Sequence, residues 1–246
     1  MKIRSLVIAG ATILGLTGCA TASPKQPAPV ELNTYILLDR TGSMGTIWDE
    51  AVSSVNSYVQ SVIEPDDGPQ VINDITLAAF DSDKGSFQFD VLRKNVKGES
   101  WKDLTKTEVS PRGMTPLFDA IGRMISVADT DAPEKAVIVV MTDGRENASR
   151  EFNKETAKAA LERAEKKGWE VVFLGAEFGN FADADAMGLQ RSKQMAVHKD
   201  KLDATMRNLA KKNRSYAQEL ADDVEFNETD RKIADEDDVK QRKGGK

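Results

Sequence analysis

The sequence predicts an α/β domain with a doubly wound, mainly parallel sheet of six strands, one antiparallel edge strand and helices on both faces. From residue 34 to residue 220, apolar runs of strand length alternate with longer segments whose apolar residues recur at helical spacing. This alternation is typical of strands joined by right-handed helical crossovers, which cover both faces of a parallel sheet. A chain of 246 residues with 40% hydrophobic content is long enough for one sizeable domain of this kind, but too short for two.

Six short apolar runs are expected to be the strands. The run AVIVVM at 136–141 is the most apolar and predicts a strand buried on both faces. The runs at 75–80 and 87–92 are joined by the polar stretch DSDKGS, which predicts a hairpin and therefore the antiparallel edge strand. The complete set of expected strands is 34–38, 75–80, 87–92, 136–141, 171–174 and 194–197.

Five segments show the apolar spacing of helices. In 47–63 one face carries Ile47, Ala51 and Val55, and in 155–167 small alanines allow close packing against a sheet. The segment 202–220 predicts a long amphipathic last helix. The expected helices are 47–63, 116–128, 155–167, 181–187 and 202–220.

The first 18 residues have the pattern of a secretory signal peptide, which would be removed. Lys2 and Arg4 precede an apolar run that is too short to span a bilayer. The run closes on LTGC at residues 16–19, which resembles the lipobox of bacterial lipoproteins and implies lipidation of Cys19, the only cysteine. An ordinary signal peptide with an incidental cysteine is the alternative.

Lipidation would anchor the protein stably to a membrane, outside the cytoplasm in a bacterial cell envelope. Ala20 after the cysteine implies the outer membrane if the source is Gram-negative.

Two terminal segments are expected to lie outside the folded domain, which is predicted at 32–226. Residues 19–31 contain three prolines among small and polar residues and predict a tether. Residues 227–246 have almost no apolar content and are expected to be disordered. The chain has 34 basic and 40 acidic residues, a net charge of −6, and no dense basic stripe, so nucleic acid is not an expected partner.

Five oxygen-bearing side chains are expected to meet at the carboxyl edge of the sheet, where ligands bind in doubly wound folds. Asp39, Thr41 and Ser43 follow the first strand, Thr115 opens a helix, and Asp143 follows the most apolar strand. Hard divalent ions prefer oxygen ligands, and hydroxyls complete the coordination without adding negative charge. The pattern therefore predicts a divalent-cation site, with Mg²⁺ as the expected ion and Mn²⁺ or Ca²⁺ as alternatives.

These residues resemble the metal-ion-dependent adhesion site of von Willebrand factor type A domains, over residues 32–226. In that family the site is a D-x-S-x-S loop with a distant Thr and a distant Asp. Asp39 and Ser43 match the loop, and Thr41 replaces the first serine while keeping the oxygen. Thr115 and Asp143 match the distant pair. The resemblance implies a Rossmann-like fold and a metal-dependent protein-binding function. Taken singly, the hydroxyls could instead be helix caps and Asp143 part of a turn.

Catalytic interpretations fit the sequence less well. The stretch TGSMG lacks the first glycine of a nucleophile elbow, and the only histidine, His198, lies far along the chain from Ser43. A phosphatase that uses Asp39 as nucleophile would need a second aspartate at the position of Thr41. A phosphate loop of the GxxxxGK[ST] type is absent.

Arg40, Arg112 and Arg145 lie in or beside the three loops, and arginine binds carboxylates through paired hydrogen bonds. They are candidates to contact acidic groups of a partner, although pairing with Glu50, Asp81 or Glu146 is an equal alternative. The leading hypothesis is a lipid-anchored, non-enzymatic module that binds an acidic protein through a divalent cation. The alternatives are a metal-dependent hydrolase using Asp39 and a structural envelope lipoprotein.

Overall fold

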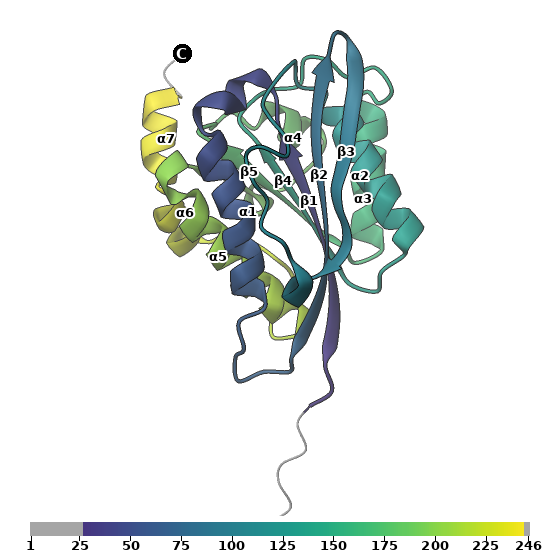
Figure 1. Ribbon diagram of the computed structural model, residues 1–246, viewed down its shortest axis with the longest axis vertical. Coiled ribbons are helices and arrows are strands. Elements are labelled where there is room, and N and C mark those ends of the chain that lie inside the picture. Colours follow the sequence, from purple (N-terminus) through teal and green to yellow (C-terminus); the bar gives the residue numbers. More distant parts are fainter. Residues whose placement is uncertain (1–26, 244–246) are drawn as a thin grey trace, which may run out of the picture.

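The computed structural model describes residues 27–243, which form one six-stranded sheet between two layers of helices (Figure 1). The strand order is β3-β2-β1-β4-β5-β6, and all neighbouring strands are parallel except β2 and β3. The predicted fold class, with its single antiparallel edge strand, is confirmed. The strands are β1 (Val30–Asp39), β2 (Val71–Asp83), β3 (Ser86–Lys97), β4 (Ala136–Thr142), β5 (Glu170–Ala176) and β6 (Gln194–Val197).

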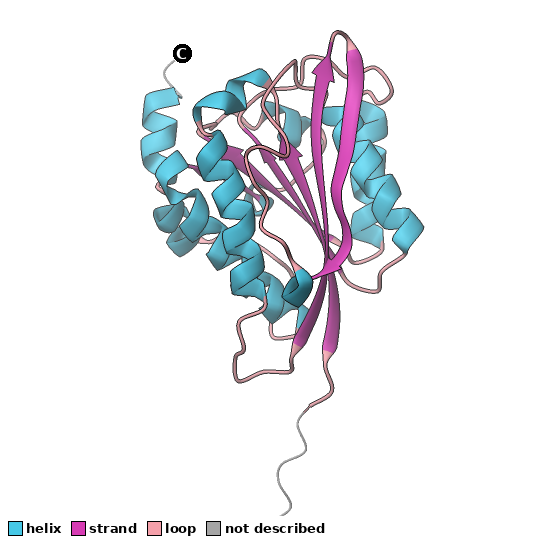
Figure 2. Cartoon of the chain, viewed as in Figure 1, coloured by secondary structure: helices cyan, strands magenta, loops and turns pink. Residues whose placement is uncertain are grey.

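In the described part of the chain, seven α-helices connect or follow these strands, and Figure 2 shows the helices in cyan. Helices α1 and α5 pack against each other on one face of the sheet, and α2 and α3 pack on the other (Figure 1). The helices are α1 (Trp48–Val62), α2 (Leu117–Asp131), α3 (Lys154–Lys166), α4 (Ala182–Ala186), α5 (Leu202–Ala217), α6 (Glu228–Ala234) and α7 (Glu236–Lys243). Among residues 27–243 there is no helix with the length and apolar character that a membrane span requires.

The central strand β1 divides the hydrophobic core into two halves. Ile36 and Leu38 pack in the half beneath α1 and α5, whereas Tyr35 and Leu37 pack in the half beneath α2 and α3. Because successive strand side chains point to opposite faces, a strand buried on both sides must be apolar at every position. All four side chains are fully buried.

The β2–β3 hairpin is longer than expected and extends beyond the rest of the sheet at its upper end in Figure 1. Its turn is formed by Lys84 and Gly85, which have φ values of 50° and 78°. Positive φ at both central residues matches the twist of the flanking strands.

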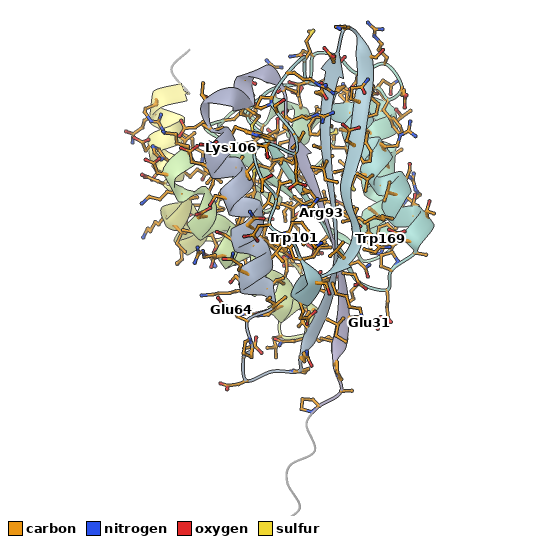
Figure 3. The ribbon with its side chains drawn as sticks, in the orientation of Figure 1. Glu31, Glu64, Arg93, Trp101, Lys106 and Trp169 are labelled. Atoms are coloured by element: carbon orange, nitrogen blue, oxygen red, sulfur yellow. The ribbon has the colours of Figure 1, made fainter. Side chains whose placement is uncertain are left out.

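The predicted signal peptide at 1–18, Cys19 and the first part of the tether lie outside the described residues. The strand β1 already begins at Val30, inside the predicted tether of 19–31, because residues 30–33 pair with Val71 and its successors in β2. Figure 3 shows Glu31 and Glu64 at the lower end of the domain, where the chain enters β1.

The expectation of a disordered segment at 227–246 is wrong for residues 227–243, which include α6 and α7. Asn227 starts α6 with a side chain that accepts hydrogen bonds from two backbone N–H groups of the first turn. Only two apolar side chains, Ala234 and Val239, are fully buried there. The segment is held mainly by polar contacts, which a search for apolar periodicity does not detect.

Glu236 is the main polar contact of this segment. Its side chain is 2% exposed and lies 2.7 Å from Arg191, 3.0 Å from Arg231 and 2.9 Å from Lys240. Burial alone would raise the pKa of Glu236, but the hydrogen bonds that it accepts outweigh burial and lower the pKa to about 2.

The same segment covers the outer edge of β6. The Ala196 N–H donates to the Glu236 carboxylate at 3.0 Å, and the His198 N–H donates to the Ala234 carbonyl at 2.9 Å. The Gln194 carbonyl accepts hydrogen bonds from the guanidinium groups of Arg191 and Arg231. These contacts replace a seventh strand, so the edge of β6 is not available for pairing with another chain.

Candidate metal centre

Three polar loops meet at the carboxyl edge of the sheet, where β1 and β4 lie side by side. After β1 the chain passes to α1 on one face, and after β4 it passes to α3 on the other. A change of face between adjacent parallel strands leaves a crevice that ligands use. The β1–α1 loop carries Thr41 and Ser43, the loop before α2 carries Thr115, and the β4–α3 loop carries Asp143.

The four side chains form a continuous series of oxygen contacts. The Ser43 hydroxyl donates to Asp143 Oδ1 at 2.8 Å and lies 3.3 Å from Thr41 Oγ1. The Thr115 hydroxyl donates to Thr41 Oγ1 at 3.3 Å. Thr41 and Thr115 are buried, Asp143 is half-buried and Ser43 is exposed, so the series runs from the interior to the surface. The structure therefore brings together the hydroxyls and the second aspartate of the predicted site.

Asp39 lies directly behind this series and is fully buried. Its two carboxylate oxygens accept hydrogen bonds from the Thr41 N–H at 2.7 Å and from the Thr142 hydroxyl at 2.5 Å. Burial raises the pKa of Asp39 to about 7, against the effect of these hydrogen bonds. A carboxylate that is enclosed and hydrogen-bonded at both oxygens is badly placed to attack a phosphoester.

Gly144 leaves room beside two of the hydroxyls. A Cβ atom at this position would lie 3.3 Å from Thr115 Oγ1 and 3.9 Å from Ser43 Oγ. The missing side chain therefore leaves space beside the oxygens that a methyl group would occupy. Within residues 27–243 no group of three or more His, Cys, Asp and Glu side chains is placed to hold a metal ion, so a cation here would depend on hydroxyl ligands.

The three arginines differ in their exposure. Arg40 is only 4% exposed and is paired with Asp81 and Asp90, so the expectation that it contacts a partner is wrong. Its position beneath the loop follows from the buried carboxylate of Asp81, which lies on the neighbouring strand. Arg112 also pairs with Asp81, but its side chain is 44% exposed, and Arg145 is 57% exposed at 3.7 Å from Asp183. Arg112 and Arg145 are therefore accessible from solvent.

Two residues that support the site were not singled out from the sequence. Thr142, the last residue of β4, donates to Asp39, and the Asn147 side chain accepts the Thr115 N–H at 2.8 Å. Thr142 has a sequence signal, because it is a polar residue that ends an apolar strand immediately before Asp143. Asn147 has none, since its role depends on how the β4–α3 loop folds back.

His198 is not part of this centre. Its Nδ1 accepts the Asp200 N–H at 3.2 Å, and its ring lies near Glu177 and Asp238 beside α7. The hydroxyl of Ser43 donates to Asp143 and not to an imidazole. The arrangement therefore lacks the base that a serine nucleophile requires.

Fold and site together define a class of protein, namely doubly wound α/β domains with a hydroxyl and carboxylate centre at the crevice of the sheet. The sequence model of the von Willebrand factor type A domain matches residues 33–227, and the chain belongs to this family. Helices α6 and α7 lie beyond the matched range.

Solved structures with the same fold come from diverse sources. The manganese-loaded TRAP protein of Plasmodium vivax is 19% identical, with a TM-score of 0.51 over 71% of each chain. The pilus adhesin SpaC of Lactobacillus rhamnosus GG is 13% identical, with a TM-score of 0.56 over 78% of this chain and 31% of the adhesin. The PilB minor pilin of Streptococcus sanguinis is 11% identical, with a TM-score of 0.52 over 81% of this chain and 64% of the pilin. Identities this low establish a common fold only. No match is found among curated protein sequences.

Proposed function

We propose that this protein is a binding module, not an enzyme, and that it captures an acidic group of a partner protein through a divalent cation. Thr41, Ser43, Thr115 and Asp143 would hold the ion, with Asp39 behind them. The ion would supply positive charge that attracts a carboxylate. The chain's own residues would arrange the oxygens and contact the rest of the partner.

The spacing of the oxygens is the observation that carries this proposal. Around an octahedral Mg²⁺ with ligands at about 2.1 Å, neighbouring ligand oxygens lie about 3.0 Å apart. The successive contacts among Asp143, Ser43, Thr41 and Thr115 are 2.8, 3.3 and 3.3 Å. Three successive pairs among these four oxygens, which come from three loops, therefore have separations compatible with adjacent ligands of a small divalent ion. One related structure, the TRAP protein, is manganese-loaded, which supports the proposal of a divalent cation.

The surroundings of the centre favour an acidic partner. Arg112 and Arg145 are exposed on two of its three loops, and Met114, beside Thr115, is 53% exposed. Guanidinium groups recognise carboxylates, and an exposed methionine adapts to different partner surfaces. A partner with one acid for the ion and further acids for Arg112 and Arg145 would match this surface. The adhesin and pilin among the related structures are consistent with a role in protein binding.

A lipid anchor at Cys19 would place the module in a bacterial cell envelope, outside the cytoplasm. The LTGC sequence supports this part of the proposal, together with the proline-containing tether that follows it. Nothing in the described residues favours the hydrolase alternative, because Asp39 is fully buried. The purified protein is expected to show no turnover of phosphoesters.

The test is capture of partner proteins from envelope extracts by wild type and Asp143→Ala, each with Mg²⁺ or with EDTA. Asp237→Ala, which changes an exposed carboxylate on α7, is the matched control. We expect one or more bands that require both Mg²⁺ and Asp143 and that persist in the control. Thermal unfolding should show that Mg²⁺ or Mn²⁺ stabilises wild type and Asp237→Ala but not Asp143→Ala. Equal melting temperatures of wild type in Mg²⁺ and in EDTA would contradict the proposed cation.

A further inference from the structure

Four charged side chains form a compact cluster beneath the candidate centre. The fully buried Asp81, near the end of β2, accepts hydrogen bonds from Arg40 Nε at 2.7 Å and from Arg112 Nε at 3.0 Å, one at each carboxylate oxygen. Arg40 Nη2 also lies 2.6 Å from Asp90 Oδ2 on β3. The two positive and two negative charges balance. We call these four residues the Asp81 clasp.

The clasp joins the two loops that carry the hydroxyls. Arg40 stands between Asp39 and Thr41, and Arg112 lies three residues before Thr115. Backbone contacts connect the same loops, because the Arg112 N–H donates to the Arg40 carbonyl at 2.8 Å and the Gly42 N–H donates to the Gly113 carbonyl at 3.2 Å. Asp81 is thus the one carboxylate in the clasp that bonds to both loops.

The close approach of the second loop to Asp81 depends on Gly113. This residue has a φ of 67°, and a Cβ atom there would lie 2.2 Å from the Ser82 carbonyl oxygen and 3.2 Å from Asp81 Oδ2. Met114 and Ser82 exchange backbone hydrogen bonds at 2.9 and 3.0 Å directly beside this point. The loop before α2 is therefore fixed to the end of β2 at the position of the clasp.

The clasp also has an electrostatic consequence. Arg40 introduces a buried positive charge next to residues that would hold a cation, and an uncompensated charge there would repel the ion. Asp81 and Asp90 compensate that charge. Removing one partner of such a buried pair leaves the other without compensation, which is costly in a site shielded from water.

We propose that Asp81 is a positioning residue for the cation site: by binding Arg40 and Arg112 together, it sets the separation of the hydroxyl-bearing loops and cancels the charge of Arg40. This inference rests on the proposed function. Asp81 does not contact the ion. It acts through the two arginines on the geometry and the potential of the site.

The test is the dissociation constant of Mn²⁺, measured by titration calorimetry on the full chain below its melting temperature. Outer residues that orient metal ligands typically change metal affinity by about 10- to 100-fold, so Asp81→Asn should weaken binding by that factor. Glu236→Gln is the matched control, because it also removes a buried carboxylate with arginine partners, but from the far edge of the sheet. It should lower stability and leave the Mn²⁺ dissociation constant unchanged.

A second measurement separates positioning from a purely structural role. Hydrogen exchange of the Gly42 N–H, which bonds to the Gly113 carbonyl across the two loops, should become faster in metal-free Asp81→Asn than in Glu236→Gln. If Asp81→Asn does not fold, Asp90→Asn decides the question. It removes the half-exposed partner of Arg40 and should weaken Mn²⁺ binding several-fold with little loss of stability.

The outcomes distinguish this inference from the proposed function. If wild type binds no Mn²⁺, both the cation site and the role of Asp81 are wrong. If wild type binds Mn²⁺ and folded Asp81→Asn binds it equally well, the cation site stands and the positioning role is overturned. Unchanged binding by Asp90→Asn would overturn the inference in the same way if Asp81→Asn is unfolded.

Discussion

Replacing Glu236 with glutamine tests how the C-terminal helices are held to the domain. The carboxylate has three cationic partners and one strand N–H, and its pKa is lowered from 4.5 to about 2. Each unit of pKa corresponds to 1.36 kcal/mol, so the folded state favours the charged form by about 3 kcal/mol. Because a glutamine oxygen can still accept hydrogen bonds, we expect Glu236→Gln to lower the free energy of unfolding at pH 7 by about 2 to 3 kcal/mol.

The lowered pKa of Glu236 determines how its contribution to stability changes with pH. A carboxylate whose pKa is lowered by folding contributes its full stabilisation above its unfolded pKa, near 4.5. That stabilisation is lost as the pH falls from 4.5 toward 2, where Glu236 becomes protonated in the folded protein as well. The difference between wild type and Glu236→Gln should therefore be largest at neutral pH and should shrink across this interval.

The assay is urea-induced unfolding followed by circular dichroism at pH 7, 5.5 and 3. The control is Glu225→Gln, an identical chemical change at an exposed position, with an expected effect of at most about 0.5 kcal/mol. A Glu236→Gln effect no larger than that of the control would refute the reasoning. So would an effect of the same size at pH 7 and pH 3.

Two further predictions concern the loop before α2 and the edge of the sheet. Gly113→Ala should lower the free energy of unfolding by about 1 to 3 kcal/mol. The added Cβ would lie 2.2 Å from the Ser82 carbonyl oxygen, and the backbone at residue 113 has a φ of 67°, which alanine rarely adopts. An unchanged melting temperature would contradict this account. Deletion of 228–246 should expose the N–H groups of Ala196 on β6 and of His198, the residue that follows the strand. The shortened chain should then self-associate as its concentration rises, which size-exclusion chromatography with light scattering would detect. A strictly monomeric product that is as stable as the full chain would show that α6 and α7 do not protect this edge.

The strands of the sheet could be predicted from the sequence, because each has a clear local pattern of apolar residues. The run AVIVVM can be stable only when both faces are covered, and β4 indeed lies at the centre of the sheet with every residue buried. The predicted strand at 194–197 has the bounds of β6. Strand ends were less predictable, because residues 30–33, with the mixed sequence VELN, join β1 through pairing with β2.

The C-terminal helices and Arg40 were mispredicted for a shared physical reason. Glu236 and Arg40 are charged residues that become buried only because opposite charges from distant parts of the chain meet them. Composition counts such residues as solvent-exposed, and no local pattern shows their distant partners, Arg191 for Glu236 and Asp81 for Arg40. By contrast, Thr41, Ser43, Thr115 and Asp143 could be predicted as neighbours, because each follows or precedes an element whose place in a doubly wound sheet is determined by topology.

The ten-residue strand β1 also determines how the domain would carry mechanical load. The chain enters β1 at the lower end of the domain (Figure 1), and the candidate centre follows directly after the last residue of the strand, Asp39. A strand of ten residues spans about 30 Å. If the chain is anchored through Cys19 and binds a partner at Ser43, as proposed, the force between the two points acts along the strand axis. Because both points of attachment lie at the two ends of the same strand, the covalent backbone of β1 would carry this force directly. The parallel hydrogen bonds between β1 and β4 would be loaded in shear only by the share of the force that enters through Asp143, which follows β4. A tether attached to an edge strand, at the same end of the sheet as the candidate centre, would instead pull that strand away from its neighbour. The hydrogen bonds between the two strands would then break one at a time.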